Sequence, residues 1–165
     1  AQTGSSTPSA RASAIGDFRA KMLQRIPKYA EFGANFDEIA FFSGNTKDKA
    51  LVQYLLRRLD MYQRSGPPLD YEQMTIEHIA PENPTAGALT ASPTHVGKLG
   101  NLLLLDQTFN NKIANKDFAA KRVAYKTAKV PLDAVVKGAK QWTDIEIDQR
   151  TATLAKLAYD HVFAL

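Results

Sequence analysis

The sequence has no cysteine and only three histidines among its 165 residues. The absence of cysteine excludes a disulfide framework and any zinc site with a cysteine ligand, and it is compatible with a reducing cytosol. No apolar run approaches the roughly 20 residues that a membrane-spanning helix needs. The sequence also lacks a Gly-rich phosphate-binding loop, so a nucleotide site of that kind is not expected within it.

The composition is that of an ordinary globular protein, with 44% hydrophobic and 23% charged residues. The length suffices for one hydrophobic core, so we predict a single domain over residues 13–165. Residues 1–12 are rich in Ser, Thr and Ala and contain neither an initiator Met nor the apolar core of a signal peptide. We therefore expect residues 1–12 to be a disordered linker of a larger protein.

The positive charge is concentrated in one segment of the chain. The net charge is +4, and the segment from Lys98 to Lys129 holds seven basic residues against two acidic ones. Such a segment suits a polyanionic partner whose phosphates meet one face of the domain. The alternative is a solvated helix face without a partner, and the residues alone leave both open.

Helical spacing and capping signals predict four scaffold helices. They cover residues 14–26, a segment that opens at Asn35, residues 47–64 and residues 143–165. Two of these starts have capping-box spacing, Asn35 with Glu38 and Thr143 with Glu146. The last helix has an apolar stripe, on which we expect His161 to be a core residue.

The segment between the predicted helices at 47–64 and 143–165 has a different pattern of residues. "QMTIEHIA" at 73–80 predicts a short strand, residues 81–98 a loop, and "NLLLL" at 101–105 a second, buried strand. A helical pattern follows over residues 107–130, with a break expected near Asn115. The predicted fold is therefore α+β and mostly helical, with a ββα unit at about residues 72–116 embedded in a helical scaffold.

Polar residues at this hairpin have the chemistry of a hydrolytic site. Neighbouring residues on a strand point to opposite faces, so Glu77 and His78 can act together only with a twist or bulge. A near-neutral imidazole can take a proton from water, and a carboxylate can hold a hard divalent cation. The amide of Asn101 could hydrogen-bond across the hairpin, and the amide oxygen of Asn110 could complete a cation site opposite Glu77.

The order of these motifs resembles a known family. "TIEHIAPEN" followed by "LGNLLLLDQTFNNKIANKDFAAKRVAY" is similar to the C-terminal HNH nuclease domain of GmrSD-type modification-dependent restriction enzymes and related phage-defence proteins. The family pattern is [Asp/Glu]-His-Ile-x-Pro, then Gly-Asn-Leu-x-Leu-Leu, a downstream Asn, and Ser/Ala-Asn-x-x-Phe-x-x-Lys. The similarity covers about residues 70–126 and implies a ββα-metal site.

The resemblance implies a role for each matching residue. His78 would be the general base that activates water, Asn101 would brace the hairpin, and Glu77 with Asn110 would hold Mg²⁺ or Mn²⁺. Because Asn110 is followed by Asn111, the second ligand could be either of these two residues. The trailing motif and its neighbours would contact DNA through Asn115, Lys116, Lys121 and Arg122. The partners implied are DNA and an N-terminal nucleotide-dependent sensor domain, in a bacterial cytoplasm and without a membrane.

Each of these residues could instead have a purely structural role. His78 could satisfy a backbone group beside the core, and the asparagines could be turn formers or helix caps. We expect His95 to be an ordinary loop residue rather than a metal ligand. The competing functions are a catalytically silent DNA-binding module with a degenerate ββα hairpin, and a ribonuclease with the same site.

Overall fold

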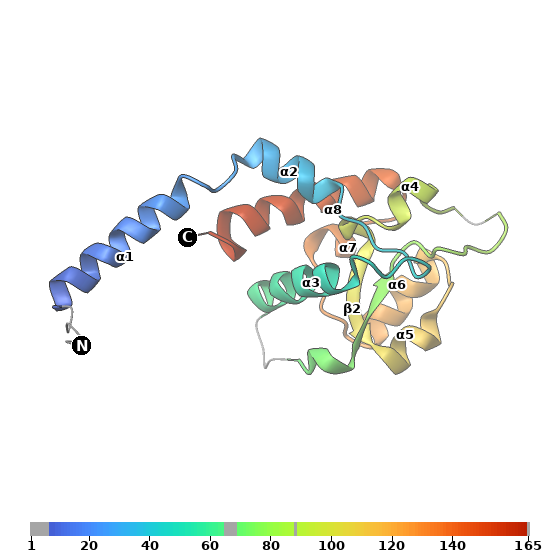
Figure 1. Cartoon of the computed structure of the whole chain (residues 1–165). Coiled ribbons are helices and arrows are strands. Elements are labelled where there is room, and N and C mark those ends of the chain that lie inside the picture. The colour runs from blue at the N-terminus through green and yellow to red at the C-terminus, as the bar shows by residue number, and fades with distance from the viewer. Residues whose placement is uncertain (1–6, 65–68, 88, 165) are drawn as a thin grey trace.

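The computed structural model describes residues 7–64, 69–87 and 89–164 of the chain, and it is mostly helical around one small sheet (Figure 1). The predicted fold class is thereby confirmed. The helices before the sheet are α1 (Pro8–Leu23), α2 (Tyr29–Asp37) and α3 (Lys49–Gln63). After the sheet come α5 (Gln107–Ile113), α6 (Phe118–Thr127), α7 (Ala134–Gly138) and α8 (Asp144–Leu157), which continues into a π-helical turn at Ala158–Val162.

The sheet is an antiparallel hairpin of β1 (Met74–His78) and β2 (Leu102–Asp106). Its connection carries the short helix α4 (Pro93–Val96), and single 3₁₀ turns, η1 (Tyr71–Gln73) and η2 (Leu99–Asn101), precede the two strands. Pairing runs one to one from Met74 opposite Asp106 to His78 opposite Leu102, so the ladder has no bulge. The hairpin followed by α5 is the predicted ββα order.

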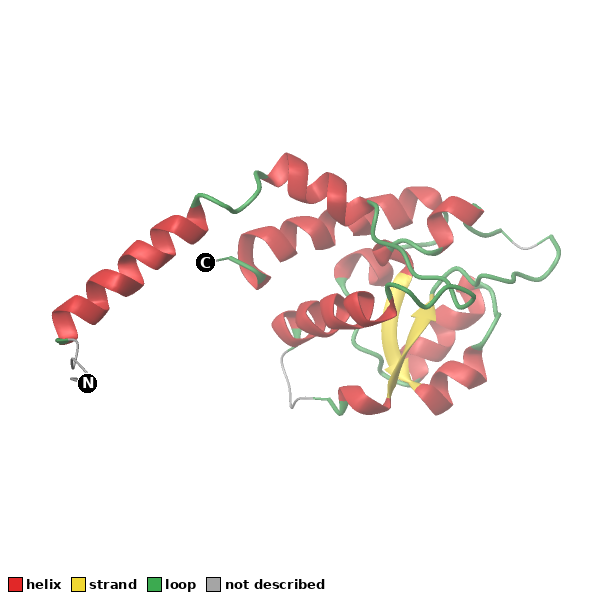
Figure 2. Ribbon diagram, viewed as in Figure 1, coloured by secondary structure: helices red, strands yellow, loops and turns green. Residues whose placement is uncertain are grey.

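The hairpin lies between two layers of helices, with α3 on one side and α5 and α6 on the other (Figure 2). Successive side chains of a strand alternate between the faces, which is why both faces of the leucine-rich β2 are apolar. Leu103 and Leu105 pack in a cluster with Ile113, Phe118 and residues of α6 to α8. Leu102 and Leu104 instead pack with residues of α2, α3 and α8.

Helix α8 holds the start of β2 in place through a very close contact at Gly100. A Cβ at this position would overlap the carbonyl oxygen of Ile147, so only glycine fits. The Arg150 guanidinium donates to the carbonyl oxygens of Gly100 at 2.7 Å and Leu102 at 2.9 Å. It also pairs with Asp133 at 2.6 Å, so its charge is neutralised where it is buried.

Several predicted helix boundaries are confirmed. Helix α3 occupies 49–63 of the predicted 47–64, and the capping box of Thr143 and Glu146 opens α8. The expected break near Asn115 is the turn between α5 and α6, where Ala114 has a φ of 38°. Asp106 and Asp117 cap the two helices on either side.

Three predictions about the scaffold were wrong or incomplete. A helix does not open at Asn35; α2 begins at Tyr29 and ends at Asp37. Helix α1 begins at Pro8, within the segment expected to be a linker, while residues 1–6 lie outside the described residues. It has no buried residue and extends away from the rest of the helices (Figure 1). His161 is exposed rather than in the core, and its ring stacks on Tyr62.

None of the described helices is both long enough and apolar enough to cross a membrane.

Candidate active site

Glu77 and His78 lie on opposite faces of the hairpin. Glu77 pairs with Leu103 and therefore faces α5 and α6, whereas His78 pairs with Leu102 and faces α3 and α8. The regular pairing supplies no bulge that would turn both side chains the same way. The structure therefore does not bring the imidazole and the carboxylate together on one face, as the predicted joint site requires.

The His78 ring is held in one orientation by the loop before α3. Its Nε2 lies 3.0 Å from the Phe41 carbonyl oxygen, and the two rings stack with centroids 5.8 Å apart. A carbonyl oxygen only accepts hydrogen bonds, so in the neutral ring Nε2 carries the proton and Nδ1 carries the lone pair. The contact with Phe41 thus selects the tautomer.

The lone pair of Nδ1 has access to water even though His78 is only 7% exposed. Nδ1 bonds to none of the described residues, and among these only Thr90 has a fully buried side-chain polar atom without a partner. Nδ1 is therefore in contact with solvent. Burial lowers the pKa of His78, so the imidazole is neutral at pH 7.

Glu82 is a neighbour of His78 that the sequence analysis did not single out. Its Oε1 lies 3.5 Å from His78 Nε2 and accepts a hydrogen bond of 2.7 Å from the Ser43 backbone. The carboxylate raises the pKa of His78, opposing the larger effect of burial. The spacing of four residues from His78 was the available signal, but the turn at Pro81 gave no reason to expect the contact.

Asn101 is completely buried, with an exposure of 0%, and all its amide groups are used. Its Oδ1 accepts from the Ala80 backbone at 2.7 Å and from the Trp142 indole at 2.9 Å. Its Nδ2 donates to the carbonyl oxygens of Ala80 at 2.9 Å and Val96 at 2.7 Å. These are the bonds expected of a brace, because they join the end of β1 to the start of β2 and to the loop before α8.

Glu77 is buried against two residues of α6. Its Oε1 lies 2.6 Å from Lys121 Nζ and accepts a hydrogen bond of 3.1 Å from the Tyr125 hydroxyl. Burial raises the pKa of Glu77 and lowers that of Lys121, and the attraction between the two charges opposes both changes. Burial beside Glu77 also raises the pKa of Tyr125, so its hydroxyl stays protonated and donates.

Asn110 ties α5 to the same strand. Its Nδ2 donates to Thr75 Oγ1 at 2.9 Å and to the Ile76 carbonyl oxygen at 3.1 Å. Its Oδ1 has no hydrogen-bond donor among the described residues. Asn111 is exposed, so Asn110 is the asparagine of this pair that faces the hairpin.

This donor set does not fit a divalent cation at Glu77 and Asn110. Lys121 already neutralises the only carboxylate, and its ammonium would repel a dication placed beside it. Within the part of the chain that the structure describes, His, Asp and Glu form no group of three suited to a metal ion. Binding at Glu77 would require Lys121 to leave its pair.

The basic segment divides into buried and exposed members. Lys121 is 0% exposed and Lys98 is paired with Asp37 and Asp148, so neither ammonium is free to meet a phosphate. The DNA contact predicted for Lys121 is therefore incompatible with its position. The remaining predicted contacts, Asn115, Lys116 and Arg122, are exposed.

His95 is half-buried in α4, and its ring lies near two acidic residues of α8. Its Nε2 is 3.3 Å from Asp148, and its Nδ1 is 3.4 Å from Asp144 and 2.8 Å from Ser92 Oγ. Lys98 pairs with the same Asp148 at 2.9 Å. The acidic side chains therefore already have cationic or hydrogen-bonding partners.

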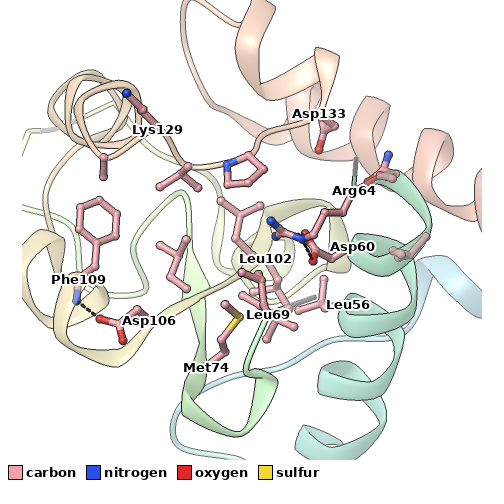
Figure 3. A pocket seen from close by; sticks show the side chains of 18 of the residues that line it. Leu56, Asp60, Arg64, Leu69, Met74, Leu102, Asp106, Phe109, Lys129 and Asp133 are labelled. Carbon is pink, nitrogen blue, oxygen red and sulfur yellow. Dashed lines mark hydrogen bonds and ion pairs between the residues drawn. The ribbon is translucent and has the colours of Figure 1, made fainter. Parts of the chain in front are cut away.

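A pocket of about 380 Å³ lies beside the hairpin, between α3 and the segment after α6 (Figure 3). It is lined by leucines of α3 and β2 and by Met74, Phe109 and Val130, with the pairs Asp60–Arg64 and Asp133–Arg150 among its polar side chains. None of the predicted site residues lines it. The pocket is therefore separate from the His78 site.

Comparison with known proteins agrees with the motif resemblance. Residues 26–157 match the family described as GmrSD restriction endonucleases, C-terminal domain. No curated protein matches the chain significantly. Since the family match spans most of the 165 residues, the chain belongs to the family of C-terminal domains of GmrSD restriction endonucleases, and is thus a domain related to restriction nucleases.

Proposed function

We propose that this domain is an HNH-type endonuclease that hydrolyses phosphodiester bonds of DNA, with His78 as the general base. One observation carries the proposal: His78 presents an unprotonated Nδ1 to solvent while Nε2 is fixed by the Phe41 carbonyl. A base must be unprotonated, oriented and in reach of water, and this imidazole satisfies all three conditions.

In the proposed reaction His78 takes part in one proton transfer. Nδ1 takes a proton from a water molecule as that water attacks phosphorus in line, and the bond from phosphorus to the 3′ oxygen breaks. The products are a 5′-phosphate and a 3′-hydroxyl, the latter after protonation by solvent. Glu82, 3.5 Å from Nε2, favours the imidazolium that forms.

Asn101 supports this reaction without touching the substrate. It fixes Ala80, two residues beyond His78, through both backbone groups. The exposed basic residues of α5, α6 and the turn between them would supply contacts to DNA phosphates that do not depend on sequence; they are Lys112, Lys116, Arg122 and Lys126. Cleavage specificity would then come from an N-terminal nucleotide-dependent sensor domain.

Dependence on Mg²⁺ or Mn²⁺ is part of the proposal. It is supported by the family resemblance rather than by the donor set at Glu77 and Asn110. Loss of cleavage in EDTA and its return on adding either ion would support it. Cleavage that persists in EDTA would reject it.

The test is cleavage of supercoiled plasmid by the 165-residue chain, beside the variants His78→Ala and His161→Ala. Loss of a general base costs roughly 10²- to 10⁴-fold in rate, whereas the exposed His161 is a matched control that should cut like wild type. DNA affinity, measured by fluorescence anisotropy, should be unchanged in both variants. Equal rates for His78→Ala and wild type would refute the role of His78. Binding without any cleavage would instead indicate a DNA-binding module. Cleavage of an RNA substrate but not of the plasmid, in a parallel assay, would indicate a ribonuclease.

A further inference from the structure

Lys121 forms an unusual buried junction between α6 and the end of β1. It is 0% exposed, and its Nζ lies 2.6 Å from the carbonyl oxygen of His78 and 2.6 Å from Glu77 Oε1. We propose that Lys121 is a positioning residue for His78, and that Glu77 and Tyr125 hold Lys121 in place rather than binding a metal ion. This inference rests on the proposed role of His78 as the general base.

The ammonium fixes the peptide unit that follows His78. Lys121 binds the carbonyl oxygen of this unit, and the amide of the same unit, that of Ile79, donates to the Asn101 carbonyl oxygen at 2.9 Å. Both polar groups of the peptide are therefore held, the carbonyl oxygen by α6 and the amide by the turn that precedes β2. With Nε2 bound to Phe41, His78 is anchored at its backbone and at its ring.

An ammonium at this depth requires a negative partner. Lysine is almost never fully buried unless it is paired, because desolvation disfavours its charged form. Glu77 supplies the charge and the Tyr125 hydroxyl donates to the same oxygen, so the two residues share the carboxylate. A phosphate of DNA cannot reach Lys121 without breaking this pair.

The sequence neighbours agree with a role inside the domain. Phe118, Lys121 and Tyr125 follow at helical spacing and are all buried, so they form the inner stripe of α6. Lys137 of α7 is exposed and lies outside the basic segment. Lys137→Met is therefore a matched control for Lys121→Met, with the same change in charge and volume.

The experiment measures the kcat and KM of plasmid cleavage, the metal-ion concentration at half-maximal rate and the Tm. The variants are Lys121→Met, Glu77→Gln, the double variant Glu77→Gln/Lys121→Met, and the control Lys137→Met. A displacement of about 1 Å at a catalytic group can cost on the order of 10²-fold. We expect Lys121→Met to lower kcat about 10- to 100-fold while KM and the metal midpoint stay within about twofold.

The double variant separates positioning from stability. It leaves no unpaired charge in the core, so it should regain most of the Tm lost in either single variant while kcat stays low. It also carries the test if Lys121→Met alone fails to fold. A double variant with both Tm and kcat of wild type would refute a positioning role.

Two further outcomes would overturn the inference in favour of the roles implied by the family resemblance. A raised KM in Lys121→Met, with a weaker dependence of DNA affinity on salt, would make Lys121 a phosphate contact. A metal midpoint raised by about tenfold or more in Glu77→Gln would make Glu77 a metal ligand. His78→Ala in the same assay distinguishes the proposed role of His78 from that of Lys121. If His78→Ala is inactive while Lys121→Met has a wild-type kcat, the positioning role of Lys121 is refuted and the role of His78 as general base is not.

Discussion

The substitution Asn101→Ala tests the brace of the hairpin most directly. It removes four hydrogen bonds inside the core, two accepted by Oδ1 and two donated by Nδ2. Alanine also leaves the Ala80 amide and the Trp142 indole without an acceptor at positions that are 2% and 1% exposed. Such a change is far more severe than the loss of a surface amide.

The expected magnitude follows from those two donors. Each buried donor left unsatisfied costs about 1–3 kcal/mol, so the pair predicts a loss of roughly 2–6 kcal/mol. The total stability of a domain is about 5–15 kcal/mol, so this variant is expected to fall near the limit of folding. Trp142→Phe removes only one donor and leaves Asn101 its contact with Ala80, so it should lose about 1 kcal/mol beyond its change in packing.

Urea denaturation followed by tryptophan fluorescence measures the loss in Asn101→Ala, and far-UV circular dichroism measures it in Trp142→Phe, which has no tryptophan. With a slope of about 2 kcal/mol per molar urea, Asn101→Ala should shift the midpoint by roughly 1–3 M. Asn111→Ala, an exposed asparagine in the same family motif, is the matched control and should not shift it. If Asn101→Ala unfolds within about 0.5 M of the control, Asn101 does not brace the hairpin and the inference from its hydrogen bonds is wrong.

Two further predictions concern pH and salt. Burial lowers the pKa of His78 below its usual 6.5. The contribution of His78 to the free energy of unfolding is therefore fully present above pH 6.5, where the ring is neutral in both states, and it is lost as the pH falls below that value. Urea midpoints at pH 8 and pH 5.5 should therefore differ less in His78→Ala than in wild type or His161→Ala, and an equal difference would show that His78 is not the titrating group. Reversing Lys116 and Arg122 to Glu should flatten the log-log salt dependence of DNA affinity by about 0.9 per lost phosphate contact, whereas Lys137→Glu/Lys140→Glu, outside the basic segment, should leave the slope unchanged. An unchanged slope in the first pair would mean that DNA approaches elsewhere.

The hairpin and its flanking helices could be predicted because their signals are local. Alternating and continuous apolar runs define β1 and β2, and the capping box of Thr143 and Glu146 opens α8 as expected. The same spacing at Asn35 gave a wrong start. There, Phe32 and Phe36 pack against residues of the C-terminal helix, and that packing extends α2 across Asn35. Tertiary contacts of this kind outweigh a local cap worth about 1 kcal/mol.

The prediction for His161 failed for a related reason. Its position three residues after Ala158 places it on the apolar stripe of a regular α-helix. The turn from Ala158 to Val162 is π-helical, however, and Val162 rather than His161 is buried there. A change in helical period is not visible in a pattern only five residues long.

The buried position of Lys121 could not be predicted from the family motif alone. Counting charges along the chain assigned Lys121 to a basic surface, but its partner, Glu77, lies 44 positions away and meets it only after the hairpin and α6 have packed. The periodicity nevertheless contained the signal, because Phe118, Lys121 and Tyr125 fall on one stripe of α6. A lysine between two aromatic core positions must find a carboxylate or lose its proton, and the "Glu-His" pair supplies that carboxylate. The same glutamate that suggests a metal ligand in the sequence thus has a second chemical use in the fold, to hold the cation that fixes the backbone of His78.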